Sequence, residues 1–412
     1  MNTIQNQSDG RYDVIVVGAG ATGLAAALAL ARDGLKVCAV GPLDARRDGR
    51  TVALLHGSIR FLQAIGVWSG LQDTAAPLAT MQLIEDTGSL FRPPPVAFHA
   101  SEIGLDAFGW NVENAALVTR LADAAQAAGV TSIQSSATEL RIEADCAVVT
   151  LADGSSLEAA LVVAADGRRS ALRDSAPIRT RTWSYPQAAL ATILSHQRDH
   201  RETSTEFHTR HGPFTLVPLP GRRSSLVWVN EPSEASRLSA LDDDQLAEVI
   251  ERQAQSMLGR MRIDGPRAVV PMSGLSVDLY WSKRLALVGE AAHVFPPIGA
   301  QGLNLGLRDA AALRDVIADA RAECADIGSD AVLQHYQRGR DLDVRLRTAA
   351  VDGLNRTLLA DMLPTDLLRG MGLLVLSKFG PLRRAVMREG LTPALATPRL
   401  MREVGRADLA TD

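Results

Sequence analysis

The chain has 412 residues, of which 46% are hydrophobic and 22% are charged, and its formal net charge is -4. These values are typical of a folded chain of two joined domains and exclude a disordered or multi-span membrane protein. Acidic and basic residues are interspersed, so no extended basic surface is available for nucleic acid, which we exclude as a partner. Three cysteines lie far apart without a CxxC pair and predict neither a zinc site nor a disulfide framework.

Four segments near the N-terminus predict a βαβ unit. A β-branched strand is expected over 12–17, a glycine-rich turn over 18–23, a helix rich in alanine and leucine through Arg32, and a second strand over 36–40. The residues before this unit are polar and contain no apolar core, so we expect no export signal and a cytoplasmic protein.

The glycine turn, Gly18-Ala19-Gly20-Ala21-Thr22-Gly23, has the spacing of a dinucleotide-binding loop. Gly18 permits a tight turn, Gly20 lets the backbone approach a pyrophosphate, and Gly23 lets the helix pack on the strand. The helix N-terminus attracts phosphate. Because a strand precedes the turn and a helix and a strand follow it, dinucleotide binding is favoured over an ordinary loop.

One part of this pattern is missing. The acid that should end the second strand and hold the ribose hydroxyls is replaced by Gly41, so Asp44 or Asp48 would have to take its place. Arg50 follows shortly afterwards and carries the charge to pair with a pyrophosphate, with a solvated surface arginine as the alternative interpretation.

Two later strands also end at small and acidic residues. The strand that ends at Asp166-Gly167 is followed by what local chemistry alone identifies only as a turn. Another strand, over 284–288, ends at Gly289-Glu290, and the loop over 296–304 leads into a helix expected over 305–314. The backbone amides at that helix N-terminus are placed to face a developing anion.

The three motifs, in this order, resemble those of the class A flavoprotein monooxygenases over nearly the whole chain, and most closely the ubiquinone-biosynthesis hydroxylase branch. The resemblance implies an α/β fold with a Rossmann-like βαβ FAD-binding domain, an inserted, mainly β-sheet substrate domain and C-terminal helices. The implied ranges are 1–75, 108–180 and 270–350 for the FAD-binding domain, 76–107 and 181–269 for the substrate-binding domain, and 351–412 for the helical segment.

The resemblance also assigns site residues. Pro297 would shape the reaction face, and the backbone amides of Gly302, Leu303 and Asn304 would stabilise the reduced flavin. Glu290 stands where the family usually has an aspartate, and its extra methylene changes that contact. The FAD-contacting residues implied by the family are Gly18, Gly20, Ala21, Thr22, Gly23, Arg50, Asn114, Asp166, Gly167, Gly289, Glu290, Gly299, Gly302, Leu303 and Asn304.

The activity implied by the resemblance is hydroxylation of the aromatic ring of a polyprenylated phenol in ubiquinone biosynthesis. FAD would be the cofactor, NAD(P)H and O2 the co-substrates, and a flavin hydroperoxide the oxygen donor. Other ubiquinone-biosynthesis proteins are expected partners. Two alternatives stay open: a hydroxylase of a small soluble aromatic compound, and a non-catalytic flavin-binding subunit of a biosynthetic complex, which the departures at Gly41 and Glu290 favour.

The pattern beyond about residue 352 is helical, with apolar residues interleaved with basic ones. These residues are Leu367, Leu368, Leu373, Leu374, Leu376 and Phe379, and Arg369, Lys378, Arg383, Arg384 and Arg388. Such a surface would rest on anionic lipid and place the protein peripherally on the inner membrane, although packing on its own core or a partner subunit is favoured.

The histidines carry no catalytic assignment. His293 follows a strand within a cofactor motif and is interpreted as structural rather than as a base. The remaining ones considered, His56, His99, His196 and His208, show no metal-ligand spacing, and we expect no metal site.

Overall fold

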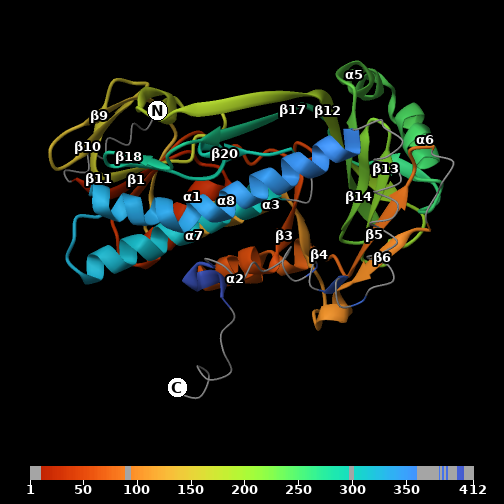
Figure 1. Cartoon of the computed structure of the whole chain (residues 1–412), viewed down its shortest axis with the longest axis horizontal. Coiled ribbons are helices and arrows are strands. Elements are labelled where there is room, and N and C mark those ends of the chain that lie inside the picture. The colour runs from red at the N-terminus through yellow and green to blue at the C-terminus, as the bar shows by residue number, and fades with distance from the viewer. Residues whose placement is uncertain are drawn as a thin grey trace, which may run out of the picture.

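The computed structural model describes residues 11–88, 94–296, 301–359, 380, 383–384, 387 and 397–402. Two large sheets lie at opposite ends of the described structure, one with eight strands and one with nine, and a three-stranded sheet lies between them (Figure 1). This arrangement confirms the predicted α/β fold with an inserted, mainly β-sheet region.

The eight-stranded sheet has a parallel centre. Its strand order is β18-β19-β11-β1-β2-β8, with β10 beside β11 and β9 beside β10. The strands are β1 (Tyr12–Val17), β2 (Val37–Val40), β8 (Thr131–Ile133), β9 (Ala137–Ile142), β10 (Ala147–Leu151), β11 (Ser156–Ala164), β18 (Trp281–Ser282) and β19 (Leu285–Leu287). Because β1, β2, β11 and β19 are parallel neighbours, the loops after them meet at one edge, where ligands bind in such sheets.

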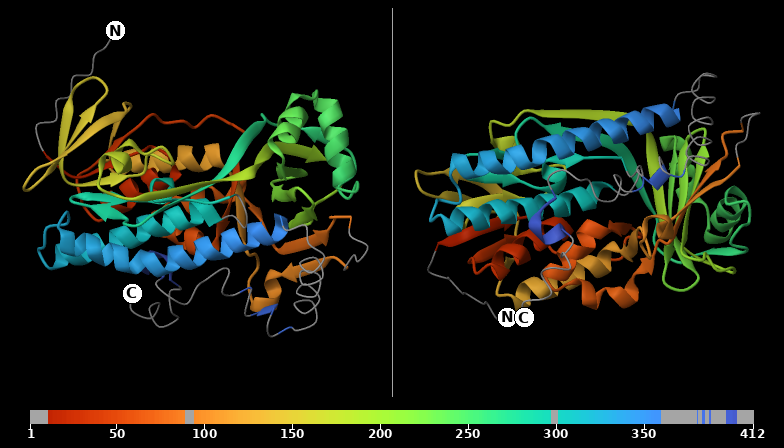
Figure 2. Two further views of the ribbon diagram at one scale, coloured as in Figure 1. Left: turned by 45° about the horizontal axis from the view of Figure 1, so that its top comes forward. Right: turned by 60° about the horizontal axis from the view of Figure 1, so that its bottom comes forward.

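Long helices pack beside this sheet. They are α1 (Ala21–Arg32), α3 (Asn114–Ala127), α7 (Gln301–Ala322) and α8 (Asp330–Leu359). Helix α1 packs against both α3 and α7, and α7 runs beside α8 (Figure 2). Small residues permit the close approach of α1 and α7, since a Cβ added to Gly306 would lie 2.6 Å from Oγ1 of Thr22.

The nine-stranded sheet is mostly antiparallel. Its order is β20-β17-β12-β15-β14-β13-β5-β6, with β16 beside β12. The strands are β5 (Thr80–Glu85), β6 (Val96–His99), β12 (Thr180–His196), β13 (Thr203–Thr209), β14 (Gly212–Leu219), β15 (Arg223–Asn230), β16 (Met261–Ile263), β17 (Ala268–Val277) and β20 (His293–Val294). Helices α5 (Pro232–Ala240) and α6 (Asp243–Gln253) cover its outer face, remote from the eight-stranded sheet (Figure 2).

Strands β12 and β17 join the two ends of the molecule. Strand β12 has 17 residues, and it pairs with β17 between Thr180 and Ala191, with a register shift between Ser184 and Ala188. The two strands run together from the nine-stranded sheet toward the eight-stranded one (Figure 1). Most of β17, together with β20, falls in the range 270–350 that the sequence assigns to the FAD-binding domain. The boundary between the two regions is therefore crossed by continuous strands.

The remaining elements complete the middle of the molecule. They are β3 (Thr51–Leu55), β4 (Ala76–Pro77), β7 (Gly109–Glu113), α2 (His56–Ala64), α4 (Ala171–Ser175), and the 3-10 helices η1 (Trp68–Gly70), η2 (Gln72–Thr74), η3 (Ala100–Ile103), η4 (Gly289–Ala291) and η5 (Arg399–Met401). None of the helices in the described ranges combines the length and apolar content needed to span a bilayer. The amphipathic surface predicted over 367–388 lies almost entirely outside the described residues.

Candidate functional site

The ends of β1, β11 and β19 bring the three sequence motifs to one edge of the sheet. Gly18 follows β1 with φ +121°, and a Cβ at this position would lie 2.1 Å from the carbonyl oxygen of Ala165, just after β11. A Cβ on Gly23 would lie 1.9 Å from the carbonyl oxygen of Gly18. Both glycines are therefore required by backbone packing, and they hold the β1 turn against the β11 turn.

Gly20 has a different environment. It is the N-cap of α1, and a Cβ added to it would meet nothing within 4 Å. The amides of Ala21, Thr22 and Gly23 have no intrahelical acceptor, because they are the first of the helix. No side chain caps the helix and no acid lies in its first turn to take the place of that acceptor. Open space in front of amides at a helix N-terminus is the environment that a pyrophosphate requires.

The glycine at the end of β2 is explained by packing. Gly41 has φ +153°, and a Cβ there would lie 2.9 Å from the backbone nitrogen of Ala19. The sequence raised Asp44 and Asp48 as replacements for the missing acid. Asp44 is fully exposed, and the hydrogen bond from Arg46 lowers its pKa to about 2. The turn at Gly41 therefore excludes any side chain, and Asp44 is already held by an arginine.

Asp48 is paired as well. Its Oδ2 accepts a hydrogen bond from Nε of Arg50 at 2.5 Å, and the Arg50 side chain remains 58% exposed. The carbonyl of Arg50 accepts the N–H of Asn114, the first residue of α3, at 3.1 Å. Two residues that the family resemblance assigns to FAD, Arg50 and Asn114, are thus neighbours. The Asp48 pairing competes with any phosphate contact that Arg50 makes.

Asp166 carries an unsatisfied atom. Its Oδ1 is buried and has no hydrogen-bond partner among the described residues, and Gly167 follows it with φ +82°. Burial raises the pKa of this carboxyl, although hydrogen bonds from Ser170 and nearby backbone oppose the rise. A buried acceptor without a donor costs free energy. A hydroxyl of a bound cofactor is the type of group that would satisfy it.

Glu290 turns toward a neighbouring loop. Its carboxylate lies 3.7 Å from Nε of Arg168, in an exposed pair that joins the turn after β19 to the turn after β11. The preceding residue, Gly289, has φ +60°, and a Cβ there would lie 3.1 Å from the Thr22 side chain. The three turns are therefore in mutual contact, and Glu290 lies at their exposed rim.

A buried ionic network lies behind the Gly289 turn. Oδ2 of Asp309 accepts hydrogen bonds from the backbone N–H of Gly289 at 2.9 Å and from Nε2 of His293 at 2.6 Å. Its Oδ1 accepts from Nε of Arg340 in α8 at 2.8 Å, and Arg340 also pairs with Asp343. Burial opposes ionisation of Asp309, but the charges of His293 and Arg340 outweigh it and lower the pKa. His293 is therefore held by a buried carboxylate, and its structural role stays a prediction.

Asn304 anchors the start of α7. Its Oδ1 accepts hydrogen bonds from the Leu55 N–H at 2.9 Å and from Oγ of Ser58 at 2.7 Å. Its Nδ2 donates to the carbonyl of Ala53 at 2.8 Å. These bonds fix the α7 N-terminus, with the amides of Gly302 and Leu303, against the junction of β3 and α2. Pro297 and Gly299 lie outside the described residues.

An apolar patch of the nine-stranded sheet lies beside the start of the 296–304 loop. It contains Ala189, Val229 and Met272, against which Tyr185, Val227 and Phe295 pack. Ala189, Val229 and Met272 are buried, whereas Tyr185, Val227 and Phe295 are only partly buried and leave some apolar surface exposed. Phe295 precedes the start of α7 at Gln301 by six positions along the chain.

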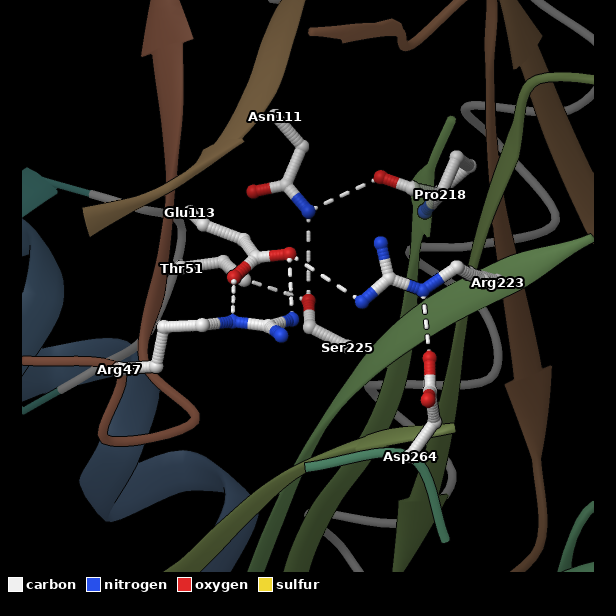
Figure 3. Close-up of polar contacts among 8 residues, drawn as sticks. All are labelled: Arg47, Thr51, Asn111, Glu113, Pro218, Arg223, Ser225 and Asp264. Carbon is white, nitrogen blue, oxygen red and sulfur yellow. Dashed lines mark hydrogen bonds and ion pairs between the residues drawn. The ribbon is translucent and has the colours of Figure 1, made fainter. Parts of the chain in front are cut away.

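Polar contacts join the nine-stranded sheet to the three-stranded one. Asn111 of β7 donates from Nδ2 to the carbonyl of Pro218 at 2.9 Å and to Oγ of Ser225 at 3.3 Å. Oγ1 of Thr51 in β3 lies 2.8 Å from the same Ser225 oxygen (Figure 3). Ser225 therefore marks the face of β15 that is turned toward the three-stranded sheet.

Charged contacts continue this junction. Glu113 accepts two hydrogen bonds from Arg47, at 2.8 and 3.0 Å, and one from Arg223 of β15 at 3.2 Å. Arg223 also donates to Asp264 at 2.6 Å (Figure 3). The bidentate geometry of the Arg47 contact is the stronger kind of surface ion pair. Glu113 thus connects the loop before β3 to the nine-stranded sheet.

The sequence missed several functional candidates. Asp309 and Arg340 were not identified, although an acid within the small and apolar stretch of α7 was an available signal. Glu206 and His208, which pair in β13, were also missed because alternating polar residues on a strand usually face solvent. No group of three metal-ligating side chains occurs within the part of the chain that the structure describes.

The donor and acceptor set fits FAD. The open space at Gly20 and the three free amides of α1 suit a pyrophosphate, the unpartnered Oδ1 of Asp166 suits a cofactor hydroxyl, and the anchored α7 N-terminus suits a ring that becomes anionic. These three features therefore suit three parts of a flavin dinucleotide: its pyrophosphate, a hydroxyl group and its flavin ring.

Comparisons with known proteins agree with this geometry. A family model described as FAD binding domain matches residues 11–347. The chain is 35% identical to ubiquinone hydroxylase UbiL of Rhodospirillum rubrum over 97% of this chain and 95% of that protein. It is 29% identical to the 3-demethoxyubiquinol 3-hydroxylase of Escherichia coli over 92% of this chain and 98% of the relative.

Solved structures show the same fold. The p-nitrophenol 4-monooxygenase PnpA of Pseudomonas putida superposes with a TM-score of 0.77 at 18% identity, covering 92% of this chain and 98% of the other. The HpxO protein of Klebsiella pneumoniae, solved with FAD, superposes with a TM-score of 0.75 at 20% identity, covering 92% and 98%. From the family match and the sequence identity to UbiL, we conclude that the chain belongs to the FAD-binding family of class A flavoprotein monooxygenases that contains the ubiquinone hydroxylases.

Proposed function

We propose that this protein hydroxylates the aromatic ring of a polyprenylated phenol in ubiquinone biosynthesis, using FAD, NAD(P)H and O2. The observation that carries the proposal is the α7 N-terminus, which Asn304 anchors and which begins six positions after Phe295, a residue that packs on the apolar patch. The names of the relatives support the choice of substrate. Bound FAD would accept a hydride from NAD(P)H and activate O2 for transfer to an electron-rich ring.

The chain's own residues would bind the cofactor, position the substrate and exclude water from the site. In this proposal Gly18, Gly20, Ala21, Thr22 and Gly23 hold the pyrophosphate through backbone amides at the start of α1. The amides of Gly302, Leu303 and Asn304 stabilise negative charge on the reduced ring, since the first N–H groups of a helix lack intrahelical acceptors.

The remaining assigned residues complete the cofactor site. Arg50 and Asn114 border the cofactor from the β3 and α3 side, and Asp166 with Gly167 and Gly289 with Glu290 hold its hydroxyl-bearing part. In this proposal the substrate ring rests on the partly buried side chains of Tyr185, Val227 and Phe295, which would exclude water from the reacting carbon. Pro297 and Gly299 belong to this proposal through the family resemblance alone.

A lipid tail on the substrate adds two further elements to the proposal. The protein would work at the surface of the inner membrane, where its substrate resides, and beside other enzymes of the same pathway.

The test begins with the absorbance spectrum of the purified protein. NAD(P)H oxidation and product formation are then measured with a prenylated phenol, with the same phenol lacking its tail, and with no phenol. Flavin bands with hydroxylation that requires the tail support the proposal. Equal activity on both phenols would identify a hydroxylase of small aromatics, and flavin bands without turnover would identify a non-catalytic subunit.

A further inference from the structure

Strand β13 carries a glutamate–histidine pair, Glu206 and His208. Its Phe207 packs with Phe214 and Trp228 against α5 and α6, on the outer face of the sheet. Residues next to Phe207 along the strand, including Glu206, point to the opposite face, because side chains alternate along a strand. Figure 1 shows α6 on the side of β13 and β14 that is remote from the FAD-binding region.

The inner face is identified by its neighbours. Glu206 is paired across the sheet with Thr215, and Thr215 with Val227. Val227 packs on the patch that contains Phe295, and Ser225, two residues earlier on the same strand, contacts Thr51. Neighbouring strands lie about 4.8 Å apart, so Glu206 is roughly 10 Å from Val227 along this row. An aromatic ring with its substituents spans such a distance.

The Glu206 carboxylate is held by two hydrogen bonds and still has acceptor positions for others. Its Oε1 accepts a hydrogen bond from Nε2 of His208 at 2.8 Å, and its Oε2 accepts one from Oγ1 of Thr215 at 3.3 Å. The side chain of Glu206 is 23% exposed and that of His208 is 9% exposed. A carboxylate has about four acceptor positions, so two remain for a further donor.

His208 gives the pair a fixed orientation. With Nε2 donating to Glu206, its other ring nitrogen, Nδ1, is buried and has no partner within the described part of the chain. The ring is thus committed to the carboxylate rather than to a second group. An oriented acid on the same face of a sheet as apolar side chains is suited to recognising one hydroxyl on an otherwise apolar ligand.

We infer that Glu206, positioned by His208 and Thr215, accepts a hydrogen bond from the ring hydroxyl of the phenolic substrate. The inference rests on the proposed function, which it deepens by naming the group that recognises the hydroxyl. The hydrogen bond orients the ring on the Val227 and Phe295 patch. It also raises electron density in the ring, because a phenol that donates to a carboxylate becomes a better nucleophile.

The test compares a prenylated phenol with its O-methyl ether, which cannot donate a hydrogen bond. Hydroxylation of both is measured as kcat/KM for the FAD-loaded wild type and for Glu206→Gln. A hydrogen bond to a charged group contributes about 1.5–3 kcal/mol, so the variant should lose roughly ten- to hundredfold in kcat/KM for the phenol. The ether should be unaffected, so the preference for the phenol should fall by the same factor.

Two further variants separate recognition from structure. Glu85→Gln is the matched control, since Glu85 is paired with His208 across β5 and β13 and contacts Thr87. It should keep the phenol preference. Thr215→Val removes only the 3.3 Å contact and should reduce the preference by a smaller factor than Glu206→Gln.

The outcomes decide the inference. A selective loss for the phenol in Glu206→Gln, with FAD content unchanged, supports it. An unchanged preference, or an equal loss for phenol and ether, overturns it and leaves the proposed function standing if the wild type hydroxylates the phenol. If Glu206→Gln does not fold, Thr215→Val decides by the same ratio. A wild type that hydroxylates neither compound overturns the proposed function and the inference with it.

Discussion

The carboxylate of Asp309 accepts the backbone N–H of Gly289 at 2.9 Å, so helix α7 directly holds the turn that carries Glu290. The same carboxylate binds Arg340, which brings α8 into the support of that turn. A residue with no place in the three sequence motifs thus determines the geometry of one of them.

Replacing Asp309 with asparagine should weaken both stability and FAD binding. The change leaves His293 and Arg340 without their shared carboxylate in the interior, and breaking such a buried pair costs about 3–5 kcal/mol. Urea unfolding measures the stability, and titration of the stripped protein with FAD measures the affinity. Asp319→Asn is the control, because Asp319 lies on the same helix in an exposed pair with Arg399 and should cost under about 1 kcal/mol.

Gly20→Val should fold normally and fail to retain FAD. A Cβ at this position meets nothing within 4 Å of the protein, so the added side chain crowds only the ligand. The flavin-to-protein absorbance ratio measures retention. Gly339→Val is the control, since a Cβ there is equally open and lies on α8, away from the glycine turn. A Gly20 variant that purifies with stoichiometric FAD would show that the pyrophosphate binds elsewhere.

Gly41→Asp should destabilise the protein rather than restore a ribose contact. The new Cβ would lie 2.9 Å from the Ala19 nitrogen, at a φ of +153° that only glycine adopts readily. Backbone strain of this kind costs about 1–3 kcal/mol. Thermal unfolding of the stripped protein measures the loss, and improved FAD affinity with unchanged stability would contradict the explanation given for this glycine.

Asp166→Asn should change how the stability of the stripped protein depends on pH. Burial raises the pKa of Asp166. Its protonated carboxyl therefore contributes fully to the stability of the fold below the ordinary aspartate pKa of about 3.9, and this contribution is lost as pH rises through the raised pKa. The asparagine variant lacks that loss. Its stability relative to wild type should therefore increase from pH 4 to pH 7 in urea unfolding, and a constant difference would contradict the prediction.

Local patterns predicted much of the fold. The β-branched run at 12–17, the alanine-rich helix through Arg32 and the strand expected at 36–40 correspond to β1, α1 and β2. These elements follow from periodicity and from glycine at turns, which act over a few residues. The crossing of the domain boundary by β12 and β17 was not predicted, because strand pairing joins residues that are far apart in sequence, such as Thr180 and Val277, which are 97 positions apart.

The site was predictable where it depends on backbone and missed where it depends on tertiary contact. The spacing of Gly18, Gly20 and Gly23 was enough to predict a tight turn between β1 and α1 with open space at Gly20. By contrast, Asp309 holds the Gly289 turn only because α7, α8 and that turn are in contact in the folded protein. Patterns in a single sequence carry no information on such tertiary contacts.

The passage of β12 and β17 from one sheet toward the other also limits how substrate preference can be engineered. Exchanging residues 181–269 between relatives would cut both strands within their hydrogen-bonded ladder, and the graft would have to rebuild that ladder in register. Substitution of individual inward-facing side chains leaves the ladder intact. Libraries restricted to that face are therefore the practical route to altered specificity in this scaffold.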